Sequence, residues 1–297
     1  MNDRERNRRF RAEQAKIRRG QTHLQRDTAK EVKRLLTLAA ERIKQQLKAS
    51  PSEWEAWYLP QLQRAVRQAM DEMSMEAGTL LRNGARASWE NGVALIDEPI
   101  KAGGVNIAAA IPEVDTRQLM AMSAFLTDRV SDISLTVANR INSELGLVMI
   151  GSQSVGDAIN KVDGLVEGGR TRAISIVRTE LGRAYSMATQ QRQEQAAEVL
   201  PGMKKQWRRS GKLHSRPEHD AADGQIVDVD KPFIVGGVPL MFPRDPAAPI
   251  GETINCGCES LPWMESWEMS TPGRKPFTDD EMARSPFRRA LQDAMDQ

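Results

Sequence analysis

Cysteine is nearly absent from this sequence. Only Cys256 and Cys258 occur among the 297 residues, and a single residue separates them. A disulfide between such near neighbours would close a strained ring, so the chain has no basis for a disulfide framework. This scarcity excludes the small disulfide-stabilised secreted folds and favours a reducing compartment.

Aromatic residues and long apolar runs are also scarce. Aromatics make up 5% of the chain, and no apolar run approaches the roughly 18 residues that a membrane-spanning helix needs. The chain begins with the charged string Met-Asn-Asp-Arg-Glu-Arg, so we expect neither a signal peptide nor membrane association. Hydrophobic residues at 40% and charged residues at 28% are typical of a chain that buries a core, and this length favours two or three structural units.

Positive charge is concentrated at the N-terminus. The net charge of the whole chain is +2, but residues 1–49 hold 15 Lys or Arg against 6 Asp or Glu. This asymmetry predicts a basic arm over residues 1–29, extended or exposed and helical, that contacts the phosphates of double-stranded DNA without reading sequence. The alternative is an ordinary solvated helix face. The predicted DNA-binding residues are Arg4, Arg6, Arg8, Arg9, Arg11, Lys16, Arg18 and Arg19.

Long amphipathic helices are predicted in residues 30–199, because apolar side chains recur there at intervals of three or four. The first helix should end before Ser50, the second near Asn91-Gly92 and the third, which follows Asp115, at Gly151. We then expect a short helix from Ser154 to Val162, a break at Gly168-Gly169 and a last long helix over residues 170–199. The apolar positions that carry this prediction include Val32, Leu36, Ile43, Leu62, Met70, Leu126, Ile133, Ile141, Val177 and Leu181.

The composition changes after Pro201. Proline and glycine become frequent, and the short runs at 225–229 and 233–235 predict strands between turns. The fold class is therefore mainly α with a small α+β, loop-rich and short-stranded C-terminal module. We predict a helical domain over residues 30–169, a second domain over residues 170–262 and a polar tail over residues 263–297, in which only Ser285 to Met295 forms a helix.

Two histidines and both cysteines fall in the small module. His219, Cys256 and Cys258, with His214 as the candidate fourth ligand, could form a closed zinc site that staples a module with little core. A purely structural interpretation is that the thiols are small buried side chains and His219 bonds to the backbone. A third interpretation is a nucleophilic Cys–His pair.

Acidic residues of the module suggest one further alternative. Asp220, Asp223, Asp228 and Asp230 could form a metal-dependent nuclease site, but each follows turn residues and is better explained by Asx-turns. The sequence contains no Walker loop, nucleophile elbow or dinucleotide fingerprint. We therefore predict no catalytic residues and no enzyme, with a metal-dependent nuclease or Cys–His hydrolase in residues 201–262 as the alternative.

A string of short motifs follows in order over residues 170–262. The motifs are Ile176-Val-Arg-Thr-Glu180, Trp207-Arg-Arg-Ser-Gly211, Arg216-Pro-Glu-His219, Ala222-Asp-Gly224, Lys231-Pro-Phe233, Gly236-Gly237, Met241-Phe-Pro243, Asp245 and Glu252-Thr-Ile-Asn-Cys-Gly-Cys258. Together they resemble the phage Mu F-like, or head-morphogenesis, family. The sequence departs from the family at two places: the segment before His219 keeps only Arg216 of the family's Asp-x-Arg-Thr-Arg pattern, and the cysteines enclose Gly257 where the family often has arginine.

This resemblance implies a minor capsid protein that is associated with the portal and acts in head morphogenesis. The implied partners are the portal protein, other head proteins (capsid or scaffold) and packaged double-stranded DNA. The implied location is the virion, in the capsid interior near the portal vertex, after assembly in the host cytoplasm. Genome packaging or ejection is the implied process. The residues themselves indicate no certain cofactor, with the structural zinc as a candidate.

Overall fold

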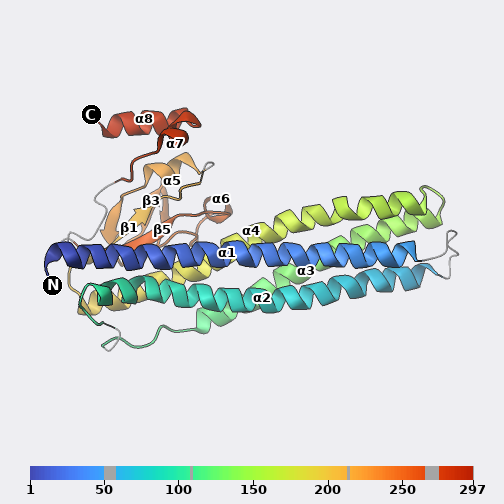
Figure 1. Cartoon of the computed structure of the whole chain (residues 1–297), viewed down its shortest axis with the longest axis horizontal. Helices are drawn as coiled ribbons and strands as arrows, with labels where there is room; N and C mark the ends of the chain where they lie inside the picture. The colour runs from blue at the N-terminus through green and yellow to red at the C-terminus, as the bar shows by residue number, and fades with distance from the viewer. Residues whose placement is uncertain (50–57, 108–109, 213–214, 265–273, 297) are drawn as a thin grey trace. The chain divides into compact units, whose positions relative to one another are not determined.

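The computed structural model describes residues 1–49, 58–107, 110–212, 215–264 and 274–296. Within these residues the chain forms four long helices followed by a small module of short strands and helices (Figure 1). The predicted mainly α fold with a small α+β module is therefore confirmed. The long helices are α1 (Asp3–Lys48), α2 (Leu59–Ala102), α3 (Arg117–Met149) and α4 (Val155–Val199).

Two of these helices continue through glycines that were predicted to end them. The α2 helix passes through Gly92, and α4 passes through Gly168 and Gly169. A Cβ on Gly92 would lie 2.4 Å from the carbonyl oxygen of Tyr185, and a Cβ on Gly169 would lie 2.9 Å from Val137 Cγ2. Gly92 and Gly169 therefore allow close helix packing, and the predicted breaks at Asn91-Gly92 and Gly168-Gly169 are wrong.

One compact unit comprises residues 24–85 and 117–180, which are parts of all four long helices. The predicted apolar stripes face its core: Leu36, Met70 and Ile133 are all buried. In Figure 1 the segments of α1 and α2 in this unit lie side by side. Polar contacts also join the helices: Arg42 to Glu72 (α1–α2), Ser134 to the carbonyl of Met70 (α3–α2) and Lys44 to Asp163 (α1–α4).

The other compact unit comprises residues 1–23, 86–116 and 181–297. Its first segment is the start of α1. This segment is helical and packed against the unit, whereas the sequence analysis predicted an extended or exposed helical arm over residues 1–29. Phe10 is buried with Ile96 and Ile100 in one apolar cluster, and a single inward-facing stripe is enough to hold the segment in this unit.

The module in this second unit contains two small antiparallel sheets. Strand β1 (Met203–Arg208) lies between β2 (Ile226–Asp228) and β5 (Glu259–Met264), and β3 (Phe233–Val235) pairs with β4 (Val238–Leu240). The runs predicted at 225–229 and 233–235 do contain strands. Trp207 on β1 and Phe233 on β3 meet edge to face, with ring centroids 5.3 Å apart, and form the core of the module with the two cysteines.

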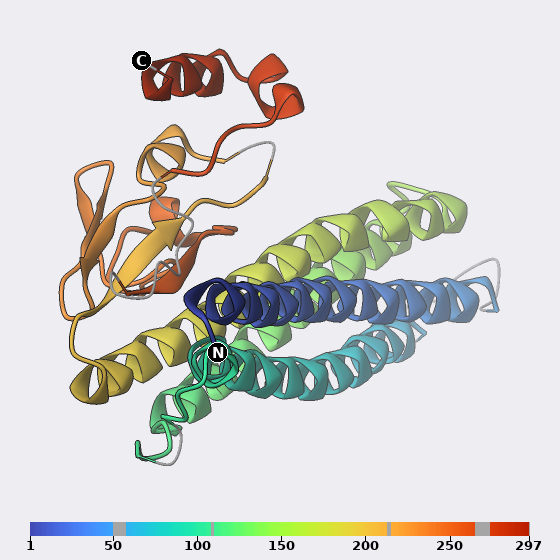
Figure 2. The same cartoon turned by 60° about the vertical axis from the view of Figure 1, so that its left-hand side comes forward.

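Short helices complete the module. They are α5 (Pro217–Ala221), α6 (Ile250–Thr253), α7 (Asp279–Ala283) and α8 (Pro286–Met295). Ser285 caps α8, which lies within the helix predicted from Ser285 to Met295. A capping box of Thr278 and Glu281 starts α7, which the sequence analysis missed. Figure 2 shows α5 between the strands and the α7–α8 segment.

Candidate metal centre

Three of the predicted metal ligands meet inside the module. The ligand atoms of His219, Cys256 and Cys258 all lie within 4.8 Å of one another, and all three side chains are buried. His219 Nδ1 is 3.6 Å from Cys256 Sγ and 3.5 Å from Cys258 Sγ. His219 comes from α5 and the cysteines precede β5, so residues 37 and 39 positions apart converge. His214, the candidate fourth ligand, lies outside the described residues.

The imidazole of His219 is held on both of its edges. Its Nε2 is 2.9 Å from Glu252 Oε2, so that Nδ1 faces the two sulfur atoms. Trp207 packs against the ring edge to face, with centroids 5.6 Å apart, and its Nε1 donates to the His219 carbonyl at 3.3 Å. A carboxylate that orients one nitrogen while the other faces the ligand position is the usual arrangement around a metal-binding histidine.

The two thiols differ in acidity. The hydrogen bond from Cys258, with a smaller contribution from His219, holds the pKa of Cys256 well below its usual value, although burial acts in the opposite direction. The same hydrogen bond, together with burial, raises the pKa of Cys258. Burial alone would lower the pKa of His219, but Cys256 and Glu252 outweigh it and raise the pKa. The cluster thus favours a thiolate on Cys256, the form that binds metals.

Three cationic side chains donate hydrogen bonds to the turn that carries the cysteines. The acceptors are the backbone carbonyls of three successive residues: Arg216 donates to Ile254 at 2.8 Å, Lys212 to Asn255 at 2.5 Å and Arg244 to Cys256 at 2.7 Å. Gly257 is required by the same packing, because a Cβ there would lie 2.9 Å from both Lys212 Cε and Ser210 Cβ. This close packing explains why a glycine stands between the two cysteines in this chain.

Arg244 connects the cysteine turn to helix α4. Its Nη2 donates to Ser186 Oγ at 2.6 Å, and a Cβ on Gly182 would lie only 2.9 Å from its Nε. Arg244 has a φ of 70°, a backbone conformation that costs energy for any residue with a side chain. The hydrogen bonds to Cys256 and Ser186 offset this strain, so Arg244 helps to fix the turn.

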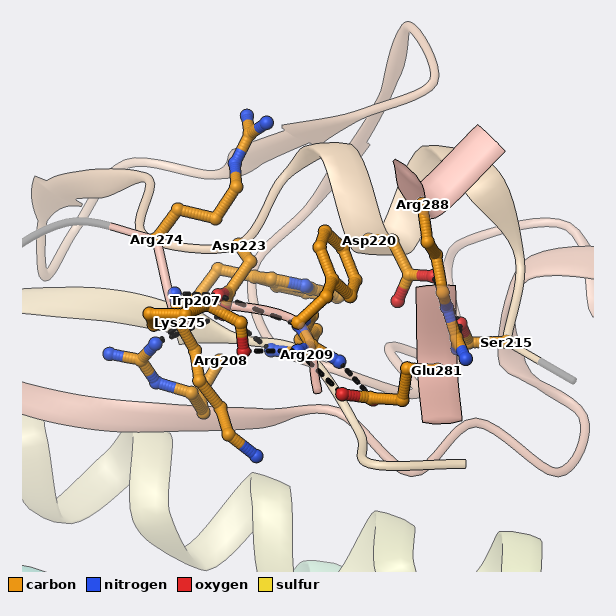
Figure 3. Close-up of polar contacts among 12 residues, drawn as sticks. Trp207, Arg208, Arg209, Ser215, Asp220, Asp223, Arg274, Lys275, Glu281 and Arg288 are labelled. Atoms are coloured by element: carbon orange, nitrogen blue, oxygen red, sulfur yellow. Dashed lines mark hydrogen bonds and ion pairs between the residues drawn. The ribbon is translucent and has the colours of Figure 1, made fainter. Parts of the chain in front are cut away.

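Asp220 and Asp223 belong to a network of buried ion pairs (Figure 3). Asp223 accepts hydrogen bonds from Arg208 at 3.2 Å and from the backbone N–H of Arg209 at 2.8 Å, and Arg209 Nη1 pairs with Glu281 at 2.7 Å. Asp220 pairs with Arg288 at 2.9 Å. Because Glu281 and Arg288 belong to α7 and α8, these ion pairs attach the segment predicted as a polar tail to the module.

The four aspartates that could have formed a nuclease site are engaged in ion pairs. Asp220 and Asp223 neutralise buried arginines, so the Asx-turn interpretation is wrong for both. Asp228 lies 3.6 Å from Lys204, and Asp230 lies 3.1 Å from Lys231. An Asx-type contact does occur at Asp245, which accepts from the N–H of Ala247 at 2.9 Å. Four carboxylates distributed in this way form no metal-binding cluster among the described residues.

The predicted DNA-binding residues all lie on the first helix, but their surroundings differ. Arg4, Arg8, Arg9, Arg11, Lys16 and Arg19 are exposed, whereas Arg6 and Arg18 are half-buried. Arg18 Nε donates to Glu259 on β5 at 2.6 Å. The structure therefore gives Arg18 a role in holding the first segment of α1 against the sheet.

Sequence reasoning overlooked Glu252, Arg244 and Arg288. Glu252 stood in the quoted string that ends at Cys258, and a carboxylate close to a predicted ligand could have been noted. Arg244 and Arg288 gave no such signal, because their importance comes from contacts with residues 58 and 68 positions away.

Comparison with known proteins supports the resemblance. Residues 138–261 match the model of the family described as Phage Mu protein F like protein. The chain is 26% identical over 162 residues to a protein of Enterococcus faecalis (strain ATCC 700802 / V583) named "NAD(+)--arginine ADP-ribosyltransferase EFV", covering 52% of this chain and 33% of that protein. It is 37% identical over 119 residues to "Uncharacterized protein YqbB" of Bacillus subtilis (strain 168), covering 39% of this chain and 37% of that protein. No solved structure matches.

The matched region does not include the whole chain. It contains the cysteine turn and the first half of β5, and it begins within α3, earlier than the residues that carry the sequence resemblance. The chain spans about a third of the length of each of the two curated relatives. No helix within the described residues is both long and apolar enough to cross a bilayer.

Proposed function

Because residues 138–261 match the Phage Mu protein F like family, a match that supports a phage head-related protein, we propose that this protein is a minor head protein of a phage. It acts in head morphogenesis at the portal vertex and in packaging or ejection of the genome. The family match is the observation that carries this proposal. Its partners are the portal protein, other head proteins and packaged double-stranded DNA, and its location is the capsid interior.

The module serves as a folding and docking unit in this proposal. Both thiols are buried, at 4% and 1% exposure, and the imidazole between them is engaged on each nitrogen. A nucleophile must be reached by its substrate, and these sulfur atoms face the core of the module. The neighbouring carboxylates are neutralised by arginines. These features support a structural role without a reaction.

Zinc fits the cluster of His219, Cys256 and Cys258. Two sulfur atoms and one imidazole nitrogen are common zinc donors, and their mutual distances suit a tetrahedral ion with metal–sulfur bonds of about 2.3 Å. Glu252 supplies the carboxylate that orients the histidine. A bound zinc would cross-link α5 to the turn before β5 and stabilise a module with a small core.

The location of the protein tests this function. Mass spectrometry of purified mature particles should detect the chain in a few copies, and tagged protein should capture the portal protein from infected cells. The capture is repeated in low and high salt. Because phosphate contacts weaken with salt, capture that persists in high salt indicates a protein interface, and capture that is lost indicates contact mediated by DNA. Absence of the chain both from mature heads and from portal complexes would reject the proposal.

A thiol hydrolase is the alternative that one observation favours. His219 Nδ1 is 3.5–3.6 Å from both sulfur atoms, within reach of a proton shared with a thiol. Turnover of a peptide or DNA substrate that is lost in folded His219→Ala and Cys256→Ala variants would establish this alternative. The transferase activity in the name of the Enterococcus faecalis relative is not carried over, because this chain covers 33% of that protein.

A further inference from the structure

Three arginines near the N-terminus share one face of the first helix. Arg4, Arg8 and Arg11 follow one another at intervals of four and three residues within α1, and such intervals bring side chains to the same side of a helix. Together with Asn7 they line an open hollow of about 440 Å³. All three arginines are exposed, so a ligand can reach them.

The other predicted DNA-binding cations lie outside this hollow. Several of them are close to acidic partners: Arg9 pairs with Glu5 at 2.7 Å, Lys16 with Glu13 at 2.7 Å, and Arg6 with Asp3 at 2.9 Å. Arg8, which lines the hollow, also pairs with Glu5, at the longer distance of 4.0 Å. Among the lining side chains that the structure describes, none is acidic. The hollow therefore concentrates positive charge.

The chemistry of the hollow fits phosphodiester groups. A guanidinium presents its donors in a planar fork that matches phosphate oxygens, and it keeps its charge at every physiological pH. Arg4 and Arg11 are seven residues apart, about 10 Å along the helix at 1.5 Å per residue. Phosphates recur along each strand of DNA about every 3.4 Å of its axis, so several lie within reach of this row.

From this arrangement we propose that Arg4, Asn7, Arg8 and Arg11 form the phosphate-binding site through which the protein contacts double-stranded DNA. The inference rests on the DNA contact in the proposed function and assigns it to one face of α1. It separates these arginines from Arg9 and Lys16, which have the same charge on the same helix but lie outside the hollow.

Two double variants of the full chain test this assignment. Arg4→Gln/Arg11→Gln removes two charges from the hollow, and Arg9→Gln/Lys16→Gln removes two charges from outside it. Binding of a fluorescent double-stranded DNA is measured by anisotropy over a range of salt concentrations. The first variant should bind about tenfold more weakly. The slope of log K against log salt concentration should become shallower by about 1.8, which is about 0.9 for each of two lost phosphate contacts. The second should bind within about twofold of the wild type.

The outcomes separate this inference from the function on which it rests. Equal losses in the two variants would overturn the site and leave non-specific DNA contact through net charge. A wild-type chain without salt-sensitive DNA binding would overturn both the site and the proposed DNA contact, whereas the head location is tested independently in particles. Tighter binding to an acidic peptide than to DNA, lost in the first variant alone, would overturn the assignment to phosphate.

Discussion

Arg288 Nε lies 2.9 Å from Asp220 Oδ2, and both side chains are 2% exposed. The pair joins helix α8 to α5, the helix that carries the candidate ligand His219. Ser215 completes the arrangement, because its hydroxyl donates to Asp220 and accepts from Arg288. The last helix is therefore attached to the element that positions the candidate metal centre.

Removal of Arg288 should strongly destabilise the module. An Arg288→Met variant leaves the carboxylate of Asp220 buried without its cation, and such a loss typically costs about 3–5 kcal/mol. The free energy of unfolding in urea measures the effect. Arg289→Met is the matched control, because Arg289 is the next residue on the same helix and is exposed; its effect should stay within about 0.5 kcal/mol. Equal effects in both variants would contradict the role of the ion pair.

Glu281 predicts a dependence of stability on pH. Burial alone would raise its pKa, but hydrogen bonds from Arg209 and Thr278 outweigh burial and lower the pKa to about 2. Because the pKa in the folded state lies below the unfolded value, the stabilisation is complete above about pH 4.5 and is lost as the pH falls towards 2. The difference in unfolding free energy between wild type and Glu281→Gln should follow this curve.

A neighbouring carboxylate controls for this measurement. Asp280 pairs with Arg284, but the two side chains are 64% and 53% exposed. An Asp280→Asn variant should therefore show a small difference from wild type at every pH. A Glu281→Gln difference that did not shrink between pH 4.5 and pH 2 would show that its ionisation is not coupled to folding.

Gly92 should tolerate no larger residue. In a Gly92→Ala variant the new methyl group would lie 2.4 Å from the Tyr185 carbonyl oxygen and 2.8 Å from Ala188 Cβ. Overpacking of this kind costs about 1–3 kcal/mol, and thermal unfolding should register it. Gly168 has open space around its Cβ position, so Gly168→Ala should instead stabilise helix α4 by about 0.5–1 kcal/mol. A stabilised Gly92→Ala variant would contradict the close approach.

These two glycines show what sequence patterns can predict about this fold. The apolar periodicity around Leu36, Met70 and Ile133 identified the long helices and the residues they bury. The same reasoning took Gly92 for a helix end, because a glycine that ends a helix and a glycine that admits a neighbouring helix look alike in one sequence. Only the approach of Tyr185, 93 positions away, distinguishes them.

The candidate site was predictable to a similar extent. Clustering of rare residue types identified His219, Cys256 and Cys258, which the structure brings together. The residues that position these three side chains could not be predicted from the sequence, because each acts through a contact between distant segments. Arg244, for example, combines a positive φ with hydrogen bonds to Ser186 and Cys256, and neither feature is visible in residue order.

Zinc should copurify with the protein. Elemental analysis should find about one zinc per chain in the wild type and a large loss in Cys258→Ser, since a closed site needs its thiolate donors. Glu252→Gln should retain the ligands but bind zinc about 10–100-fold more weakly, because the carboxylate orients His219. His23→Ala is the control, since His23 is exposed on α1 and should leave the zinc content unchanged. A wild-type content below about 0.1 metal per chain would remove zinc from the proposal.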